Sequence, residues 1–334
     1  MKTYGIYALL TFVVLFSSCK EEGAFSHSPS ERSALSISTL RKELTETPHG
    51  WKVTYFSKTD SLIFADLNAK IVETRYEQEY GVGGHYFHMK FDPKGTVQIR
   101  ADYDETSASK IQESEYEIKQ NTFTQLSFTT YNYLHKLVDD TFSASPDFLY
   151  IGKDLDGNLR FRTPSYFESA GEYILFEKVT SPEEEQSLVS TALANRLFFE
   201  GMRYPQIKIH KGDRVYFDSN YFFKYDDSFA TWIKKSSQKR YRVFLYNKSL
   251  LRERLDLIGL GSGYTGTDRG LSFQTGFRFN KTFIFRDFER VGDRFVCELV
   301  RVYDPKTRIW RYKSKHLAPD GEPTGMIAEI CNRE

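Results

Sequence analysis

Two short motifs contain residue types that bind phosphates or metal ions, but neither has the context that this chemistry needs. Residues 261–266 read GSGYTG, a G-x-G-x-x-G pattern. A dinucleotide site needs a strand before this pattern and a helix after it. Because the Leu271-Ser272-Phe273 strand follows instead, we expect a flexible surface loop. Residues 154–158 (DLDGN) offer oxygen ligands for Ca²⁺, but the glycine and a closing glutamate are not at calcium-loop spacing. We expect a turn there.

The histidines and cysteines form no metal-binding or catalytic signature. The seven histidines include no H-E-x-x-H pattern, and His85 and His88, three apart on a predicted strand, point to opposite faces. No G-x-S-x-G nucleophile elbow occurs. We therefore predict no metal, no cofactor and no catalytic residue, although a hydrolase built from residues distant in sequence stays open. Beyond Cys19, the chain has Cys297 and Cys331, and both a disulfide between them and two free thiols fit an oxidising compartment.

Two neighbouring runs carry side chains that suit a sugar-like or anionic ligand. Residues 216–232 contain eight aromatic side chains, which stack on sugar rings if exposed and form a core if buried. Residues 231–254 contain eight Lys or Arg against one Glu, and Arg311, Lys313 and Lys315 give a later strand one basic face. Such surfaces attract an anionic glycan or a lipopolysaccharide headgroup; a solvated face offset by the acidic residues 102–117 is the alternative. The best candidates for ligand contacts are Tyr221, Tyr225, Trp232, Arg240 and Arg242.

The N-terminal segment predicts a cleaved signal peptide and a lipid anchor. Lys2 precedes a mostly apolar run over residues 4–16, which is shorter than the roughly 20 residues that a membrane-spanning helix needs. Small residues then precede Cys19, as in a bacterial lipobox. Cleavage after residue 18 leaves Cys19 to carry acyl chains, and several chains give stable anchoring. A soluble secreted protein with an incidental Cys19 is the alternative.

The residues after Cys19 indicate a second targeting signal. Lys20, Glu21 and Glu22 resemble the tag that exports lipoproteins of the Bacteroidetes to the outer face of the outer membrane. A solvated charged tether over residues 19–27 has the same composition. We expect a lipid-anchored outer-membrane protein that faces the cell exterior.

Composition bounds the partners and the number of domains. The chain has 46 basic and 45 acidic residues, and removal of residues 1–18 takes away one lysine, so the mature chain is formally neutral. This balance argues against a nucleic-acid partner. The 334 residues less 18 exceed the usual size of a single core, so two domains are expected.

The periodicity predicts a helix followed by a β-meander in each half. Ser28, Pro29 and Glu31 read as a capping box that opens a helix with Leu35, Ile37, Leu40 and Leu44 on its buried face. Strands follow at residues 51–56, 86–91, 97–101, 115–119, 123–129, 148–151, 159–162 and 172–178, with a hairpin turn at 92–95 and a short helix within 131–138.

Residues 181–184 repeat the Ser-Pro-x-Glu signature, and Leu188, Val189, Ala192, Leu193 and Leu197 form an amphipathic stripe. Strands are then predicted at 206–210, 221–225, 241–246, 270–273, 282–288, 294–303, 308–316 and 326–330. We therefore expect a mainly β fold with a minor α part. It would consist of two antiparallel β-meander domains, residues 28–180 and 181–334, each a barrel or a sandwich opened by one helix.

Three stretches in the first half resemble one family. They are residues 48–51 (PHGW), 83–92 (GGHYFHMKFD) and 126–135 (LSFTTYNYLH). Their order and spacing are similar to those of Bacteroidetes lipoproteins of domain-of-unknown-function family 4302. Residues 267–273 and 285–288 fit more loosely, and the sequence departs from the family around 147–163.

The resemblance implies a surface lipoprotein, often encoded beside outer-membrane nutrient-import pairs of the starch-utilisation type. It implies no activity and no catalytic residues. We therefore expect a non-catalytic ligand-binding or accessory subunit of a glycan-type import system. The alternatives are a structural partner protein of an outer-membrane complex and, less favoured, a surface hydrolase.

The export tag can be tested on whole cells. If Lys20, Glu21 and Glu22 direct the lipoprotein to the outer face, then changing all three to alanine should protect the protein from externally added protease. The measurement is protease shaving followed by immunoblotting, with a periplasmic protein as the control for cell integrity. Unchanged surface cleavage of the triple variant would contradict the assignment.

Overall fold

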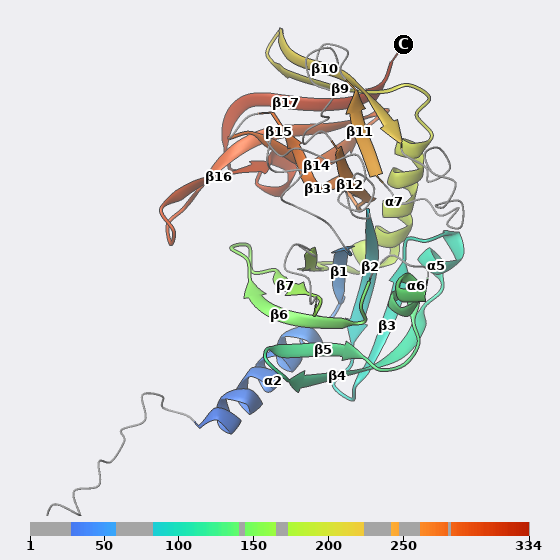
Figure 1. Ribbon diagram of the computed structural model, residues 1–334, viewed down its shortest axis with the longest axis vertical. Coiled ribbons are helices and arrows are strands. Elements are labelled where there is room, and N and C mark those ends of the chain that lie inside the picture. Colours follow the sequence, from blue (N-terminus) through green and yellow to red (C-terminus); the bar gives the residue numbers. More distant parts are fainter. Residues whose placement is uncertain are drawn as a thin grey trace, which may run out of the picture.

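The computed structural model describes residues 28–57, 83–139, 144–164, 173–223, 242–246, 261–279 and 282–333, with the backbone alone for some strand residues, 219–223 and 242–246 among them. Two β units lie one above the other in Figure 1, and a long helix runs along one side of both. The mainly β architecture predicted from the sequence is confirmed. No helix in the described ranges is long and apolar enough to cross a membrane.

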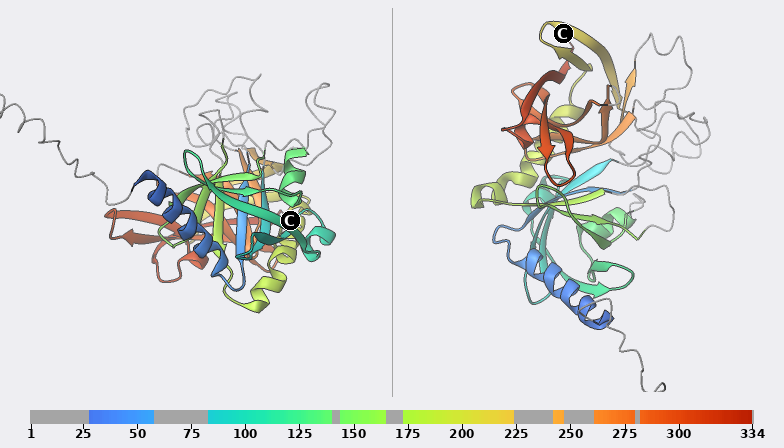
Figure 2. Two further views of the ribbon diagram at one scale, coloured as in Figure 1. Left: turned by 90° about the horizontal axis from the view of Figure 1, so that it is seen from below. Right: turned by 90° about the vertical axis from the view of Figure 1, so that its left-hand side faces the viewer.

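Helix α2 (Pro29–Thr45) begins at the predicted capping box. The Glu31 backbone N–H donates to Ser28 Oγ at 3.3 Å, and the Ser28 N–H donates to the Glu31 carboxylate at 2.7 Å. Leu40 and Leu44 are buried against the barrel, but Leu35 is 58% exposed. The prediction for Leu35 is wrong because five residues place it about 140° around the helix from Leu40. Figure 2 shows this helix lying across the end of the barrel away from the second sheet.

The first unit is a closed barrel, which settles the choice between barrel and sandwich for this half. Its antiparallel strands follow chain order: β1 (Trp51–Phe56), β2 (Gly84–Phe91), β3 (Thr96–Ala101), β4 (Gln112–Gln120), β5 (Thr124–Phe128), β6 (Asp147–Lys153), β7 (Leu159–Arg162) and β8 (Tyr173–Lys178). Strand β1 pairs with both β2 and β8 and so closes the barrel. The hairpin predicted at 92–95 joins β2 to β3, with Gly95 N–H donating to the Asp92 carbonyl at 3.1 Å.

Aromatic rings fill the barrel. Trp51 is fully buried, and its Nε1–H donates to the Leu44 carbonyl at 3.0 Å, which fixes α2 to the barrel. Around it lie Phe91, Phe148, Phe161 and Phe176, with ring centroids 4.7 to 6.3 Å apart. The sequence also predicts the short helix α6 (Tyr133–Asp139), but it misses helix α5 (Glu105–Ser109), which Asp104 caps.

The second unit is a single curled sheet. Its strands are β9 (Pro205–Lys211), β10 (Arg214–Phe223), β11 (Arg242–Tyr246), β12 (Gly261–Gly266), β13 (Gly270–Arg278), β14 (Ile284–Val291), β15 (Arg294–Asp304), β16 (Ile309–Ser314) and β17 (Glu322–Asn332). They are ordered β14-β13-β12-β11-β10-β9-β17-β15-β16, and an additional β14–β15 pairing curls the sheet (Figure 1). A short 3₁₀ turn, η3 (Lys315–Leu317), follows β16.

The G-x-G-x-x-G segment is strand β12, so the expected surface loop is wrong. It pairs with β11 and β13, and the side chains of Tyr264 and Thr265 are buried. Gly266 lies against helix α7, where an added Cβ would be 2.0 Å from the Ala192 carbonyl oxygen. The glycine therefore permits close packing of helix on strand. With a strand and no helix after it, the segment lacks the geometry of a dinucleotide site.

Helix α7 (Pro182–Glu200) packs against both β units. It begins at Ser181, whose side chain accepts the Glu184 N–H. Leu188, Val189, Ala192 and Leu193 are buried as predicted, but Leu197 is 49% exposed. The buried stripe instead continues through Arg196 and Phe199.

Strand β2 has one polar face, but this face is not in solvent. Tyr86 and His88 are buried because α7 lies across the outside of the barrel at β2. His88 Nε2 donates to the His49 carbonyl at 2.8 Å, which leaves Nδ1 to accept from Arg100 at 3.2 Å. Burial lowers the pKa of His88 to about 4, so its ring is neutral in this contact. Lys90 ends the row and pairs with Glu185 of α7 at 2.9 Å.

A buried ion pair joins α7 to the barrel at its other end. Arg196 Nη1 donates to Asp102 Oδ2 at 2.5 Å, and both side chains are almost completely buried. The Arg196 guanidinium also donates to the Asp102 backbone carbonyl. Nearby, Asn195 Nδ2 donates to the Thr267 carbonyl at 2.9 Å, which connects α7 to the second sheet.

We expect Arg196→Ala to reduce the free energy of unfolding by about 3–5 kcal/mol, because it leaves the Asp102 carboxylate buried without its cation. Urea unfolding of the chain from residue 24 onward measures this. The control is Arg294→Ala, which removes an exposed pair with Glu329 at 3.4 Å and should cost less than about 1 kcal/mol. Equal losses for the two variants would show that the buried pair contributes no more to stability than an exposed one.

Candidate functional site

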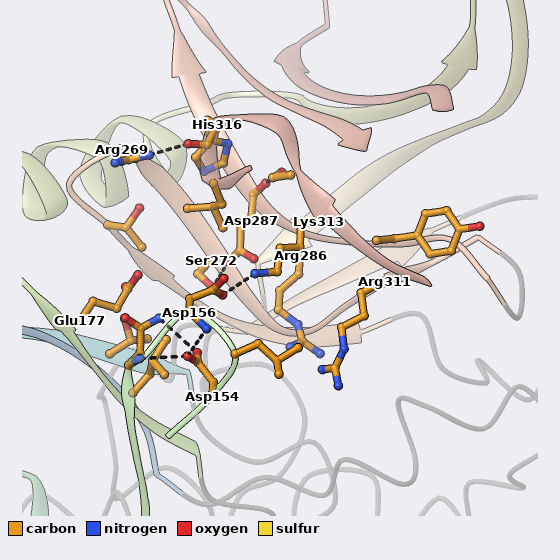
Figure 3. Close-up of a pocket in the computed structure, with 18 of the residues that line it drawn as sticks. Asp154, Asp156, Glu177, Arg269, Ser272, Arg286, Asp287, Arg311, Lys313 and His316 are labelled. Carbon is orange, nitrogen blue, oxygen red and sulfur yellow. Dashed lines mark hydrogen bonds and ion pairs between the residues drawn. The ribbon is translucent and has the colours of Figure 1, made fainter. Parts of the chain in front are cut away.

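A cleft of about 700 Å³ lies between the two β units. One wall is the outer face of β1, β7 and β8 together with the β6–β7 turn. The other wall is formed by the β12–β13 turn, β13, β14, β16 and η3. Figure 3 shows charged side chains from both walls pointing into this space. The cleft therefore exists only while the barrel and the second sheet are docked.

Strand register places the charged groups of the barrel wall. Lys52 of β1 lies directly opposite Glu177 of β8, and in the next row Leu175 of β8 lies between Thr54 of β1 and Arg160 of β7. Side chains opposite one another on one face of a sheet have Cβ atoms about 5 Å apart. Lys52 and Glu177 are thus neighbours in the wall.

Lys52 is the central cation of the cleft floor. Its Nζ lies 3.0 Å from Glu184 of α7 and 3.1 Å from Asp268 in the β12–β13 turn. Asp268 also accepts the Tyr86 hydroxyl at 2.9 Å. Burial opposes the charge of Lys52, but Asp268, Glu177 and Glu184 outweigh it and raise its pKa. One lysine therefore ties the barrel, α7 and the second sheet together.

Glu177 differs from the other acids of the cleft. It is partly buried, and it makes no hydrogen bond or ion pair within the described part of the chain. Burial and the carboxylates of Asp268 and Asp287 raise the pKa of Glu177 to about 7, against the opposing effect of Lys52. Near neutral pH this carboxyl group can therefore donate or accept a hydrogen bond.

The remaining carboxylates are engaged. Asp154 accepts the backbone N–H groups of Asp156 and Asn158, each at 2.9 Å, so the predicted turn at 154–158 is confirmed. Asp156 pairs with Lys313 across the cleft, and Asp287 accepts the Ser272 hydroxyl at 2.7 Å. No group of three or more metal-ligating His, Cys, Asp or Glu side chains occurs in the described ranges.

The arginines of the cleft fall into two groups. Arg269 donates to the His316 carbonyl at 2.6 Å, and Arg311 lies 3.5 Å from Asp304. Arg160 and Arg286 are exposed and have neither a hydrogen bond nor an ion pair in the parts of the chain that the structure describes. Among the described residues, therefore, nothing engages the N–H donors of these two guanidinium groups.

An aromatic surface adjoins these charges. Trp310 of β16 lines the cleft and packs on Tyr303 of β15 with ring centroids 5.3 Å apart. Each side chain is 46% exposed, and Arg301 lies over the Trp310 ring at 4.6 Å. The β15–β16 hairpin that carries them projects from the sheet (Figure 1).

The ligand contacts predicted from the sequence are not among the described residues that line the cleft. Tyr225, Trp232 and Arg240 lie outside the described residues, and Tyr221 and Arg242 are described by backbone alone, on β10 and β11. Lipidation of Cys19 and the export tag of Lys20, Glu21 and Glu22 also fall outside them.

Part of the basic face predicted for Arg311, Lys313 and Lys315 lies in the cleft. Arg311 and Lys313 do line the cleft, while Lys315 pairs with Glu298 at 2.9 Å. The acids that offset this strand are Asp156, Asp304 and Glu298, not the region 102–117 suggested by the sequence.

Four charged residues of the cleft were not predicted from the sequence: Lys52, Arg160, Glu177 and Arg286. For Lys52 and Glu177 the available signal was a charged residue within a mostly apolar strand, whereas the strands of Arg160 and Arg286 carry other charged residues.

Cys297 and Cys331 are both free thiols. Cys297 is buried on β15 opposite Ala328, with its Sγ 2.9 Å from Ser314 Oγ, and burial raises its pKa to about 12. Cys331 lies three residues beyond Ala328 on β17, so its side chain points to the other face of the sheet. Of the two alternatives from the sequence, the structure has the unpaired one.

The raised pKa of Glu177 predicts that the free energy of unfolding depends on pH. Its pKa in the folded state, about 7, lies above the ordinary 4.5, so the folded state binds this proton more tightly than the unfolded state. The resulting stability is complete below pH 4.5 and is lost as the pH rises through 7. We expect Glu177→Gln to gain about 2 kcal/mol relative to the wild type between pH 5 and pH 8.

Chemical unfolding at the two pH values measures the change. The matched control is Glu113→Gln, which replaces an exposed glutamate on β4 of the same barrel. If the two variants show the same pH dependence, Glu177 does not hold its proton in the folded state.

Comparison with known proteins gives a family but no activity. No curated protein and no solved structure matches the chain. A family model described as "Domain of unknown function (DUF4302)" matches residues 21–291, which include the barrel, α7 and the second sheet as far as the end of β14. This match covers most of the 334 residues, and the chain therefore belongs to the DUF4302 family.

Proposed function

We propose that this protein is a lipid-anchored protein of the outer-membrane surface that captures a saccharide in the cleft, as a non-catalytic subunit of a nutrient-import system. The observation that carries the proposal is the exposed Tyr303–Trp310 pair beside a cleft whose Glu177 and Arg286 have no partner in the described part of the chain. An apolar ring face with hydrogen-bonding groups around it suits a sugar ring, which has one apolar face and a rim of hydroxyls.

The size and the walls of the cleft fit this role. Its volume of about 700 Å³ lies within the range typical of small-molecule sites. Because Lys52 joins the barrel, α7 and Asp268 through buried contacts, the two walls are held in place before a ligand arrives. Preorganisation of this kind lowers the entropic cost of binding.

The expected anchor is compatible with an accessible cleft. Lipidation at Cys19 would place a short tether, residues 19–27, before α2. Helix α2 lies at the end of the barrel away from the second sheet (Figures 1 and 2). The cleft and the β15–β16 hairpin would then be further from the membrane than α2. Nutrient import as the setting rests on the family resemblance.

Removal of the Trp310 ring tests saccharide binding. We expect Trp310→Ala to weaken binding of the glycan selected on an array about tenfold or more, because truncating a central tryptophan of a binding site typically costs over 1 kcal/mol. Calorimetry on the chain from residue 24 onward gives the affinity. Tyr303→Phe keeps the ring pair and should bind as the wild type does, and Tyr204→Ala removes an exposed ring that does not line the cleft.

If no neutral or acidic glycan binds, or if Tyr204→Ala weakens binding as much as Trp310→Ala does, saccharide capture is wrong. Copurification with outer-membrane proteins and no glycan binding would instead support a structural partner.

One observation favours a second candidate, a surface glycoside hydrolase. Glycosidases use a pair of carboxyl groups on the two sides of the scissile bond, and Glu177, with its pKa raised to about 7, lies near Asp268, whose carboxylate is 3.1 Å from Lys52 Nζ. Release of reducing ends from the bound glycan, abolished in Glu177→Gln, would establish this activity. Intact glycan after prolonged incubation with the wild type would exclude it for that ligand.

A further inference from the structure

The cleft has an excess of uncommitted positive charge. Arg160 projects from β7 of the barrel, and Arg286 projects from β14 of the second sheet, so the two line the same cleft from opposite walls. Both are exposed, and within the described ranges neither forms a hydrogen bond or an ion pair. Figure 3 shows the guanidinium groups of Arg286 and Arg311 pointing the same way.

The acids do not offset these two arginines. Asp268 is held by Lys52 and Tyr86, Asp287 accepts a hydrogen bond from Ser272, and Asp156 pairs with Lys313. Asp154 accepts the N–H groups of its own turn. Glu177, the carboxyl group without a partner there, is protonated in part near neutral pH. A ligand that enters the cleft therefore meets unpaired cations and largely satisfied anions.

We propose that Arg160 and Arg286 form a subsite for the acid group of an acidic saccharide, a uronate carboxylate or a sulfate ester. This inference rests on the proposed function and specifies its ligand class. A guanidinium group presents a planar fork of N–H donors that matches a carboxylate or sulfate in bidentate geometry. The aromatic pair at Trp310 binds the ring face, and the arginines bind the charged substituent.

Exposure of the arginines sets the expected strength of this contact. Charges at an exposed site are screened by salt, with a Debye length of about 10 Å at 0.1 M and about 3 Å at 1 M. The preference for an acidic ligand should therefore be largest at low ionic strength. Stacking on Trp310 should change little with salt, because it involves no net charge.

The experiment compares ligands that differ only in the acid group. Binding of oligogalacturonate is measured beside its full methyl ester, and binding of a sulfated galactan oligosaccharide, which has no uronate, beside its desulfated form. An array of neutral glycans accompanies them. The proteins are the wild type, Arg160→Gln, Arg286→Gln and the control Arg294→Gln, which removes an exposed arginine far from the cleft lining.

The expected result is at least tenfold tighter binding of one acidic form than of its neutral counterpart at 50 mM salt. That preference should fall by at least threefold in each cleft variant and in 500 mM salt, with affinity for the neutral counterpart unchanged. Arg294→Gln should match the wild type. A preference for the acidic member of the galacturonate pair identifies a carboxylate ligand, and a preference for the acidic member of the galactan pair identifies a sulfate.

Three outcomes would overturn the inference. Equal binding of acidic and neutral forms, or binding of neutral glycans alone, leaves saccharide capture intact and removes the acid subsite. Equal loss of both forms in the cleft variants shows a structural effect of the substitutions. Binding of no glycan at all removes both proposals.

Discussion

The arrangement of the whole molecule depends on charges that are buried between the barrel and helix α7. A buried ion pair adds little net stability compared with an apolar contact, but loss of one partner is costly. Separating Arg196 from Asp102 is therefore unfavourable, and the same holds for separating Lys52 from Glu184 and Asp268. Separating α7 from the barrel would expose an apolar seam and leave Arg196 and Asp102 unpaired, and separating the second sheet from the barrel would break the Lys52–Asp268 pair. This constraint makes an otherwise open groove into a cleft with fixed walls.

A fixed cleft changes how its remaining charges act. In a flexible loop, Arg160 or Arg286 could turn to any nearby carboxylate, whereas the carboxylates here are held by Lys52, Ser272 and Lys313. The strand register keeps Lys52 beside Glu177, and the docking of the second sheet on the barrel keeps Asp268 beside Lys52. The interface between the barrel and the second sheet thus leaves Arg160 and Arg286 without a carboxylate partner among the described residues.

Local features of the fold could be predicted from the sequence, and long-range ones could not. The capping box at Ser28, the turn at 92–95 and the alternation of β2 each depend on a few neighbouring residues. The polar face of β2 reads as solvent-exposed because the sequence does not show that α7, about a hundred residues later, covers it. Residues 261–266 read as a loop for the same reason. Their glycines permit contact with a helix, as the position of Gly266 against Ala192 shows.

The site was harder to predict than the fold because its residues are far apart in the sequence and come together only in the folded chain. The dense run of aromatic and basic residues lies at 216–254, yet the cleft combines charged residues from seven separate strands and turns. The family match ends at Val291, so Lys52, Arg160, Glu177, Asp268 and Arg286 lie inside it, and the hairpin with Tyr303 and Trp310 lies outside. The residues proposed for charge recognition and those proposed for ring stacking therefore lie in different segments of the chain. The hairpin projects from the sheet and takes no part in the Lys52 or Arg196 ion pairs, so its rings can vary without disturbing the cleft floor.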